Sequence, residues 1–448
     1  MRILVIAMLL KKLIKNLPEE KKNIKVKGLS INSKKTQKGF IFFAIRGTRL
    51  NGEKFIDNAV NNGASVVACS KNCKYKNKNI LVIKTSDVRG LLAEISSKFY
   101  HKKPKNIIAV TGTNGKTSVA DLYYQILSLN NIPVASIGTL GTKFKGKIIN
   151  SELTSPDTIS LHQTLSKLKE KKIDNVIIEA SSHGLHQKRI DNLNLKAGVF
   201  TNFSQDHLDY HKTMKSYLNS KLLLFKKILS KNKFVIVDET IKEFKIIQKI
   251  SKKKNLHLKS ITPIKRKIEK NKELNLNEFQ LKNLSMAILA AKISNIKEKQ
   301  IFKCLRKLKS VNGRLELVKI FKNNIKVYVD FAHTPDALFK SLQALKRLNK
   351  RNVSVVFGCG GDRDFKKRSK MAKIVSSICK KIYVTDDNPR NEKPSKIRNE
   401  IVKYIKNKNC FNISDRSKAV KTAILNAEPN EIILIAGKGH ETKQIFKN

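Results

Sequence analysis

Short apolar runs alternate with polar loops and helical stretches along most of the chain. From about Pro104 onward, each run is rich in β-branched residues and ends in a polar cluster, and a helical stretch follows. Strands of continuous apolar residues that alternate with helices predict a parallel sheet covered on both faces. Ligands of such a sheet bind beyond the carboxyl ends of its strands. The polar clusters all lie at that end of their own strands, in the segments "NIIAVTGTNGKTSVADLYYQIL", "NVIIEASSHGL", "AGVFTNFSQDHLD", "NIKVYVDFAHTPDAL", "NVSVVFGCGGDRD", "KIYVTDDNPR" and "EIILIAGKGHE".

The first hundred residues contain shorter runs. They predict short strands around "GLSINSK", "GFIFFAI", "SVVAC" and "NILVIK" and one helix near Phe55 to Asn62, which is typical of a small α/β module. The apolar run Ile3 to Leu10 is too short to cross a bilayer, and Lys11 and Lys12 follow it without a small-residue cleavage site. We expect this run to begin an amphipathic helix, "AMLLKKLIKNL".

Two features divide the rest of the chain. A Lys-rich stretch from Ile241 to Glu273 is interpreted as a solvated connection or surface helix, and "SVNGRLELV" (Ser310 to Val318) as a junction before a third unit that begins near Asn324. A chain of 448 residues exceeds one ordinary core, since domains usually hold about 100 to 200 residues. We therefore predict an α/β protein with three domains, at residues 1–103, 104–313 and 314–448.

The composition is strongly basic, with a formal net charge of +57. Clustered cations gain affinity for a polyphosphate by releasing its counterions, so the charge alone would suggest nucleic-acid binding. The Lys residues, however, occur in nearly every segment alongside many Asn, and the sequence has no Arg-rich tract or basic patch interleaved with aromatic residues. We therefore expect no dedicated nucleic-acid surface. The six Cys show no CxxC pair and no zinc spacing, so reduced thiols in the cytoplasm are expected.

One polar cluster has the form of a phosphate-binding loop. The string "AVTGTNGKTS" (Ala109 to Ser118) follows an apolar strand and opens a helix, a context that directs backbone N–H groups at phosphate. Lys116 would neutralise β- and γ-phosphate oxygens, and Thr117 would offer its hydroxyl to Mg²⁺. The generic pattern has Gly five positions before Gly115, where this sequence has Val110. An ordinary strand-to-helix turn would explain a lone glycine-rich turn, whereas the full "TGTNGKT" favours a nucleotide.

This string also resembles the ATP loop of the Mur ligase and folylpolyglutamate synthetase superfamily. Further strings match that pattern in order, over roughly residues 28 to 445: "EASSHGLHQKRI", "FTNFSQDHLDYH", "NGRLE", "DFAHTPDAL", "FGCGGDRD", "TDDNPR" and "AGKGHE". "SSHGL" with "DHLDYH" indicates the Mur ligase family, and "DNPR" its diaminopimelate-adding branch. The resemblance implies a small N-terminal α/β domain for the UDP-muramyl substrate, a central P-loop ATPase domain with a mainly parallel sheet, and a C-terminal Rossmann-like domain for the amino acid.

The implied reaction is amide formation between a carboxylate and an amine, in peptidoglycan precursor synthesis. ATP is required because a carboxylate oxygen is a poor leaving group: phosphoryl transfer gives an acyl phosphate, and attack by the amine expels phosphate. Cations that stabilise the developing charge are the expected apparatus. The resemblance implies UDP-muramyl dipeptide, meso-diaminopimelate and ATP as substrates, Mg²⁺ as cofactor, and a cytoplasmic monomer without a membrane span.

The resemblance assigns roles in nucleotide and metal binding. Glu179 and His207 would bind Mg²⁺ together with Thr117, although His207 taken alone would be interpreted as a hydrogen-bonded loop histidine. Lys221 matches the lysine that becomes carbamylated, as N6-carboxylysine, and holds a second Mg²⁺, since an unmodified ammonium would repel the metal. The implied catalytic residues are Lys116, Glu179, His207 and Lys221, and the implied ATP-binding residues are Gly112, Thr113, Asn114, Gly115, Lys116, Thr117, Ser118, Asn283, Arg314 and Asp330. The last three match residues near adenine, phosphate and ribose respectively, and each could equally be a structural polar group.

The resemblance also implies two substrate sites. Hydroxyls, amides and an Arg suit a uridine diphosphate and a muramyl peptide, and the matching residues are Ser33, Thr48, Asn51, Thr154, Ser155, Ser181, Gln187 and Arg189. Ser33 lies in "INSK", where the family more often has Asp-Ser-Arg. The diaminopimelate site would supply cations for carboxylates and an anion for an ammonium, from Arg363, Asp387, Asn388, Pro389, Arg390, Gly437 and Glu441. Pro389 would stiffen the loop that presents Arg390.

Two other functions are alternatives. A folylpolyglutamate synthetase shares the ATP loop but does not require both "DNPR" and "SSHGL". A P-loop NTPase that couples hydrolysis to nucleic-acid movement is suggested only by the charge.

Overall fold

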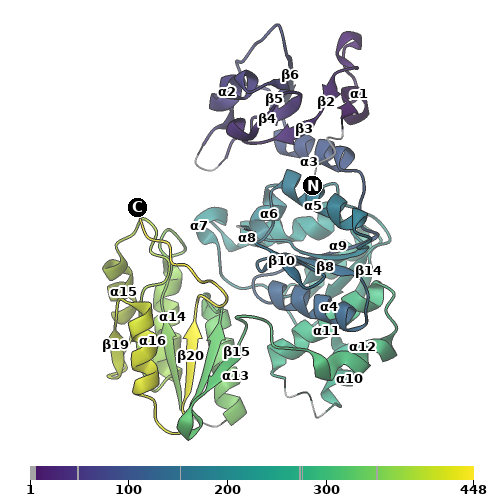
Figure 1. The fold of residues 1–448 in the computed structure, drawn as a ribbon. Coiled ribbons are helices and arrows are strands. Elements are labelled where there is room, and N and C mark those ends of the chain that lie inside the picture. The colour runs from purple at the N-terminus through teal and green to yellow at the C-terminus, as the bar shows by residue number, and fades with distance from the viewer. Residues whose placement is uncertain are drawn as a thin grey trace.

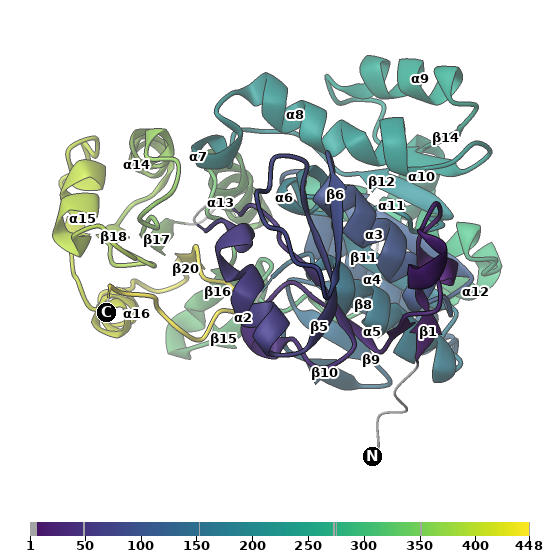
Figure 2. The same cartoon turned by 90° about the horizontal axis from the view of Figure 1, so that it is seen from above.

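The computed structural model describes residues 7–47, 50–151, 153–271, 274, 276–349 and 352–447. It contains three α/β domains in chain order, each with its own sheet (Figure 1). The N-terminal domain caps one end of the central domain, and the C-terminal domain lies beside the central domain (Figures 1 and 2). Each of the three larger sheets falls within one predicted domain range, and the predicted boundaries at 103/104 and 313/314 stay a prediction.

The N-terminal sheet has four parallel strands in the order β3-β4-β5-β6. Consecutive residues enter opposite cores, because Phe43 packs with α1 and α3 whereas Phe42 packs with α2. This is the two-residue period of a strand. The elements are β1 (Met8–Leu9), α1 (Leu10–Leu13), β2 (Lys25–Val26), β3 (Gly28–Ser30), β4 (Phe40–Phe43), α2 (Ile56–Asn61), β5 (Ala64–Ser70), β6 (Leu81–Thr85) and α3 (Val88–Phe99).

The helix expected near Phe55 to Asn62 is confirmed as α2, but the long amphipathic helix expected in "AMLLKKLIKNL" is wrong. Only α1 is helical there. Met8 and Leu9 instead pair antiparallel with β2, and this pairing commits their backbone to a strand. Leu10 and Leu13 still enter the core.

The central sheet has eight strands in the order β10-β9-β8-β11-β7-β12-β13-β14, parallel except at β9 and β10. Ile108 and Val110 of β7 face α4, α10, α11 and α12, whereas Ile107 and Ala109 face α5, α6, α8 and α9. The predicted sheet covered on both faces is therefore confirmed. The strands are β7 (Asn106–Thr111), β8 (Val134–Gly138), β9 (Gly141–Phe144), β10 (Lys147–Ile149), β11 (Asn175–Glu179), β12 (Ala197–Phe200), β13 (Phe234–Val237) and β14 (His257–Ser260). The helices are α4 (Lys116–Leu129), α5 (Thr158–Glu170), α6 (Ser182–His186), α7 (Leu208–His211), α8 (Met214–Leu223), α9 (Phe244–Lys253), α10 (Thr262–Glu269), α11 (Glu278–Ile293) and α12 (Glu298–Cys304), with a π-helical turn at Leu224–Ile228.

The Lys-rich stretch from Ile241 to Glu273 is more ordered than the sequence indicated. It holds α9, β14 and α10, and β14 is the parallel edge strand of the central sheet. The lysines of its described part, residues 241–271, are exposed or half-buried, while Ile247, Ile264 and Ile268 are buried in the cores on either side. Of the two interpretations of this stretch, the solvated connection was therefore wrong, and the surface helix is confirmed in α9 and α10.

The C-terminal sheet has six strands in the order β15-β16-β20-β17-β18-β19, with only β15 antiparallel to its neighbour. Helices α13, α14 and α15 cover one face, and α16 covers the other. The elements are β15 (Glu316–Ile320), β16 (Lys326–Asp330), α13 (Pro335–Asn349), β17 (Val353–Phe357), α14 (Lys366–Ile378), β18 (Ile382–Val384), α15 (Pro394–Val402), β19 (Cys410–Asn412), α16 (Arg416–Leu425) and β20 (Ile432–Ala436). The junction "SVNGRLELV" thus already contains the start of β15 of this sheet, Glu316 to Val318.

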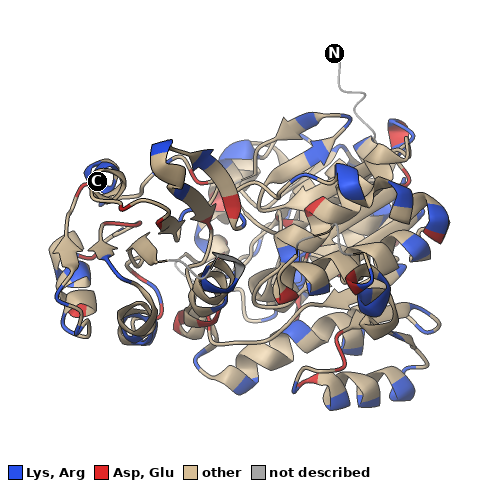
Figure 3. Ribbon diagram, turned by 90° about the horizontal axis from the view of Figure 1, so that it is seen from below, with Lys and Arg blue, Asp and Glu red and all other residues tan. Residues whose placement is uncertain are grey.

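Lys and Arg are distributed over elements of all three domains (Figure 3). Within the ranges given above, every helix lacks the length or the apolar character needed to cross a membrane.

Candidate active site

The phosphate loop joins the end of β7 to the start of α4. Gly115 caps α4 with a left-handed φ of 85°, and a Cβ there would lie 2.5 Å from Oδ1 of Asn283. Glycine suits this position because it accepts the left-handed backbone and leaves room for that amide. Asn202, after β12, holds the loop: its carbonyl oxygen accepts from the N–H of Thr113, and its Oδ1 accepts from the N–H of Asn114. The N-terminus of α4 is therefore fixed in a form that suits an anion.

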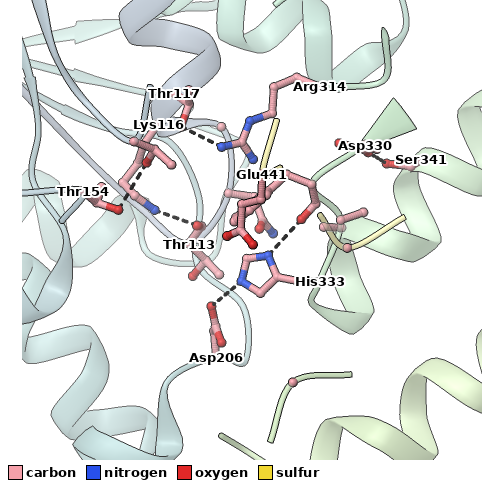
Figure 4. Close-up of a pocket in the computed structure, with 18 of the residues that line it drawn as sticks. Thr113, Lys116, Thr117, Thr154, Asp206, Arg314, Asp330, His333, Ser341 and Glu441 are labelled. Atoms are coloured by element: carbon pink, nitrogen blue, oxygen red, sulfur yellow. Dashed lines mark hydrogen bonds and ion pairs between the residues drawn. The ribbon is translucent and has the colours of Figure 1, made fainter. Parts of the chain in front are cut away.

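Lys116 folds back over this loop. Its Nζ donates to the carbonyl oxygens of Gly112 at 3.0 Å and Thr113 at 2.9 Å (Figure 4). Burial lowers the pKa of Lys116, and the nearby Arg314 acts in the same direction, whereas Glu179 opposes them. A phosphate placed here would supply the negative charge that favours the ammonium form.

Hydrogen bonds surround the carboxylate of Glu179. The register of β11 with β7 sets Glu179 beside the loop, and the residue is only 1% exposed. Its Oε2 accepts from Oγ1 of Thr117 at 2.9 Å and from Oγ1 of Thr139 at 3.1 Å, and its Oε1 accepts from the Thr139 N–H at 2.8 Å. Arg314, from the C-terminal side, donates through Nη2 to Oγ1 of Thr117 at 2.8 Å (Figure 4). A carboxylate, a hydroxyl and a guanidinium therefore converge beside the phosphate loop.

The donor chemistry of this group fits Mg²⁺. Among the described residues, no three His, Cys, Asp or Glu side chains come together in a way that could hold a metal ion. Mg²⁺ usually keeps several waters and is bound by one or two carboxylates together with substrate phosphates. The hard oxygens of Glu179 and Thr117, adjacent to a phosphate loop, match that requirement.

Lys221, on α8, lies directly behind the loop. Its Nζ donates to the carbonyl oxygen of Gly112 at 2.6 Å and lies 4.4 Å from the ring centroid of Tyr217, and the residue is 1% exposed. Burial and the neighbouring Lys116 lower the pKa of Lys221 well below its ordinary value. The amine is thus held in a place where its neutral form is favoured.

Asp206 links the central and C-terminal domains through two histidines. Its Oδ2 lies 3.3 Å from Nε2 of His207 and 3.5 Å from Nε2 of His333, which follows β16 (Figure 4). Burial alone would raise the pKa of Asp206, but His207 and His333 lower it well below its usual range. Asp206 is therefore an anion buried between the two domains.

Apart from Lys221, the groups described above line one cavity of about 320 Å³ between the central and C-terminal domains. The central domain contributes the predicted residues Thr113, Asn114, Gly115, Lys116, Thr117, Ser118, Thr154, Glu179, Ser181, His207 and Asn283. The C-terminal side contributes the predicted residues Arg314, Asp330, Arg363, Asp387, Asn388, Arg390, Gly437 and Glu441. The structure thus brings the phosphate loop and the "DNPR" loop into a single cavity.

Arg390 is held at the C-terminal wall of this cavity. Its φ is 55°, and its Nη1 donates to the carbonyl oxygens of Gly361 at 2.8 Å and Asn388 at 3.2 Å. A Cβ on Gly360 would lie 2.8 Å from this Nη1, so the glycine leaves room for the guanidinium. Both bonds use Nη1, and within the described residues the Nε and Nη2 edge makes no hydrogen bond. That edge is the one that can grip a carboxylate through two parallel bonds.

Arg363 reaches across the cavity toward the central domain. Its Nη1 lies 3.6 Å from Oδ2 of Asp209 on α7, and its side chain is 42% exposed. An exposed pair of this kind is weak, so a ligand carboxylate can compete for the guanidinium.

Several predicted residues lie outside the cavity lining. Ser155, Gln187 and Arg189 form a group of their own, in which Arg189 donates to the carbonyl oxygen of Ser155 at 2.7 Å and to Oε1 of Gln187 at 2.7 Å. Ser155 in turn contacts Oγ of Ser181 at 3.0 Å, which connects this group to the cavity. Gly112, Lys221 and Pro389 also do not line the cavity, Ser33 and Asn51 belong to the N-terminal domain, and Thr48 lies outside the described residues.

Sequence reasoning missed seven charged or polar residues of the cavity: Thr139, Asn202, Asp206, His333, Lys340, Ser341 and Lys367. Asp206 and His333 stand in polar clusters at strand ends, in "SQDH" and "FAHTP", and this position was the available signal. Lys367 is only 6% exposed, but nothing in the sequence separates it from the other lysines.

The sequence matches Mur ligase families along most of its length. Residues 25–100 match "Mur ligase family, catalytic domain", residues 110–301 match "Mur ligase middle domain", and residues 313–439 match "Mur ligase, glutamate ligase domain". The UDP-N-acetylmuramoyl-L-alanyl-D-glutamate--2,6-diaminopimelate ligase of Rickettsia montanensis is 40% identical over 94% of this chain and 92% of its own length. The relative of the same name from Brucella melitensis biotype 1 is 34% identical over 96% of this chain and 92% of its own length.

A solved structure shows the same arrangement. The structure titled as a UDP-N-acetylmuramoyl-L-alanyl-D-glutamate--2,6-diaminopimelate ligase aligns with a TM-score of 0.68 and 26% identity, over 98% of this chain and 95% of that chain.

Proposed function

The chain belongs to the Mur ligase family, and on that premise we propose that it joins meso-diaminopimelate to UDP-N-acetylmuramoyl-L-alanyl-D-glutamate at the expense of ATP. This reaction lengthens the peptide of a peptidoglycan precursor. One observation carries the proposal: the phosphate loop and the "DNPR" loop, which belong to different domains, line the same cavity. A ligase needs this arrangement, since the activated carboxylate and the attacking amine must meet.

Lys116 and Arg314 are the cations of the phosphoryl-transfer site. The ammonium of Lys116 donates to carbonyl oxygens of the loop, and a bound phosphate can compete with them for this ammonium. Arg314 holds the Thr117 hydroxyl next to Glu179. Together they stabilise negative charge that develops as phosphate passes to the γ-carboxylate of the dipeptide. Asn283 and Asp330 complete the proposed ATP site, toward adenine and ribose.

Glu179, Thr117 and His207 would hold Mg²⁺ in this site. When bound, the metal neutralises phosphate charge and orients the oxygens of ATP. Three hydrogen-bond donors, from Thr117 and Thr139, keep the two carboxylate oxygens of Glu179 fixed next to the loop.

Lys221 is proposed to carry a carbamate. A neutral lysine amine attacks the carbon of CO₂, a C–N bond forms, and the nitrogen loses a proton to give an anionic N-carboxylate. The burial of Lys221 and its proximity to Lys116 favour the neutral amine that this step needs. The product would place an anion beside Lys116, in place of a repelling ammonium.

The UDP-muramyl dipeptide is proposed to extend from the cavity toward the N-terminal domain. Ser155, Ser181, Gln187 and Arg189 form a connected polar group on that path, and Thr154 lines the cavity beside them. The uridine end would reach Ser33, Thr48 and Asn51.

The amino acid is proposed to bind at the C-terminal wall. Arg390 would grip the carboxylate of the far end of diaminopimelate with its open edge, Arg363 the α-carboxylate, and Glu441 an ammonium. Asp387, Asn388, Pro389 and Gly437 shape this wall. We also propose that the domain boundaries lie at 103/104 and 313/314, and that the enzyme is monomeric and cytoplasmic.

The test is a substrate panel. Phosphate release from ATP is measured with UDP-linked dipeptide and each of a set of amino acids, and separately with single-stranded DNA or with a folate and glutamate. The proposal expects release, with peptide product, only for UDP-linked dipeptide plus diaminopimelate. Stimulation by DNA or by folate and glutamate would support the alternative functions instead.

A further inference from the structure

Lys438 lies immediately behind the proposed diaminopimelate site. It belongs to "GKGHE", between Gly437 and Glu441, which line the cavity, but it does not line the cavity itself. The residue is 7% exposed, and its Nζ donates to Oδ1 of Asn388 at 2.9 Å, to Oε2 of Glu441 at 2.8 Å and to the carbonyl oxygen of Lys443 at 2.6 Å. A lysine ammonium has three donors, and all three are matched by protein oxygens.

These bonds fix the orientation of the Asn388 amide. Oδ1 of Asn388 accepts from Lys438 and also from the N–H of Ile445 at 2.9 Å, so both of its acceptor positions are used. Nδ2 donates one hydrogen to Oε2 of Glu441 at 3.2 Å. Because Asn388 lines the cavity, the group that it has left for a ligand is the second N–H of Nδ2.

The same ammonium fixes the charge of Glu441. Oε2 of Glu441 accepts from both Lys438 and Asn388, which leaves Oε1 as the acceptor available to a ligand. Burial would raise the pKa of Glu441, but the hydrogen bond and charge of Lys438 lower it, with help from Asn388 and His440. The guanidinium groups of Arg314, Arg390 and Arg416 add positive charge around this carboxylate.

We propose that Lys438 is a positioning residue that sets a hydrogen-bond donor, Asn388, directly beside an anionic acceptor, Glu441, and thereby selects an amino acid whose far end carries both a carboxylate and an ammonium. This inference rests on the proposed function. Diaminopimelate has both groups on one carbon at its far end, whereas lysine has only the ammonium. Without Lys438, Oδ1 of Asn388 loses one of its two donors, and the Asn388 amide can turn its oxygen toward the cavity. The far carboxylate of the substrate would then face an acceptor where it needs a donor.

The test replaces Lys438 with Met, which keeps the length of the side chain and removes its charge. The KM for meso-diaminopimelate should rise at least ~10-fold, on the scale of a lost charged hydrogen bond, while the KM values for ATP and UDP-linked dipeptide stay within about twofold. The slow rate with L-lysine should change little, so the preference for diaminopimelate over lysine should fall. Lys438→Arg should restore part of this preference. A uniform loss on all substrates, or an unchanged KM for diaminopimelate, overturns the inference.

Lys381→Met is the matched control. Lys381 is also largely buried, 14% exposed at its side chain, and pairs with Glu431 at 3.1 Å in the same domain, but it lies at the other end of the sheet from the cavity. Its replacement should leave every KM unchanged. If circular dichroism shows that Lys438→Met does not fold, Asn388→Asp serves instead. This change puts an acceptor in place of the Nδ2 donor and should raise the KM for diaminopimelate. An unchanged KM overturns the inference.

Failure of the unaltered protein to use diaminopimelate at all would overturn the proposed function. Normal use by Lys438→Met would overturn this inference alone.

Discussion

Arg390→Ala removes the guanidinium that is proposed to bind the far carboxylate of diaminopimelate. Nη1 already donates to the carbonyl oxygens of Gly361 and Asn388, so the side chain is oriented before substrate arrives and little rotamer entropy is lost on binding. The open edge can make two charged hydrogen bonds, each contributing about 1.5–3 kcal/mol. Because Arg390 is only partly buried, we take the lower value for each.

Two such bonds amount to about 3 kcal/mol, which corresponds to a loss of about 10²-fold in kcat/KM for meso-diaminopimelate. The kcat/KM for L-lysine, which has no far carboxylate, should stay within about threefold. Since a polar site rejects an analogue that leaves it unpaired, the unaltered enzyme should prefer diaminopimelate by ~10⁴ or more, and this preference should fall by about 10²-fold in the variant.

The assay is phosphate release at varied amino acid, with saturating ATP and UDP-linked dipeptide. Arg347→Ala is the control, since Arg347 is an exposed arginine on α13 in the same domain and should behave as the unaltered protein. If Arg390→Ala keeps its selectivity, or if both amino acids suffer equally, the role assigned to the open guanidinium edge is wrong.

Three further perturbations test other parts of the molecule. Lys116→Ala should lower ligation at least ~100-fold, because a preorganised phosphate contact is lost, with an unchanged melting temperature; normal turnover and ATP affinity would contradict the phosphate-loop assignment. Removal of CO₂ should lower activity reversibly, and ¹³C-bicarbonate should give an NMR signal that Lys221→Ala lacks; a signal present in both proteins would count against carbamylation. Burial lowers the pKa of His162 to about 3 from its ordinary 6.5, so the unfolded chain binds the proton first. The free energy of unfolding should therefore keep its full value above pH 6.5 and fall as the pH is lowered, by about 2 kcal/mol at pH 5. Urea unfolding measures this pH dependence, and His162→Phe should flatten it. An unaltered slope would show that His162 is not the group responsible.

The parts of the site that could be predicted from sequence are those encoded by a local pattern. The phosphate loop and "DNPR" each follow an apolar run, and parallel strands carry such loops to one edge of their sheet. Strand β14 had no such pattern. It is an edge strand whose residues alternate between exposed and half-buried, and a short strand with His257 and Lys259 looks like any polar stretch.

Other features depend on distances that no local pattern encodes. Asp206 and His333 come from different domains, and their approach depends on how those domains pack. No local sequence feature distinguishes Lys221 from the many exposed lysines, and only the packing of α8 behind the phosphate loop buries it. Lys438 is similar, because its three acceptors come from two separate loops and the segment that follows them.

The most direct measurement of the central claim is a competition read by mass spectrometry. The protein is incubated with ATP, Mg²⁺, UDP-N-acetylmuramoyl-L-alanyl-D-glutamate and an equimolar mixture of amino acids that includes meso-diaminopimelate and L-lysine. We expect one UDP-linked product, extended by diaminopimelate and formed in step with one ADP and one phosphate. A product extended by lysine, or ATP consumption without any extended UDP-linked peptide, would contradict it.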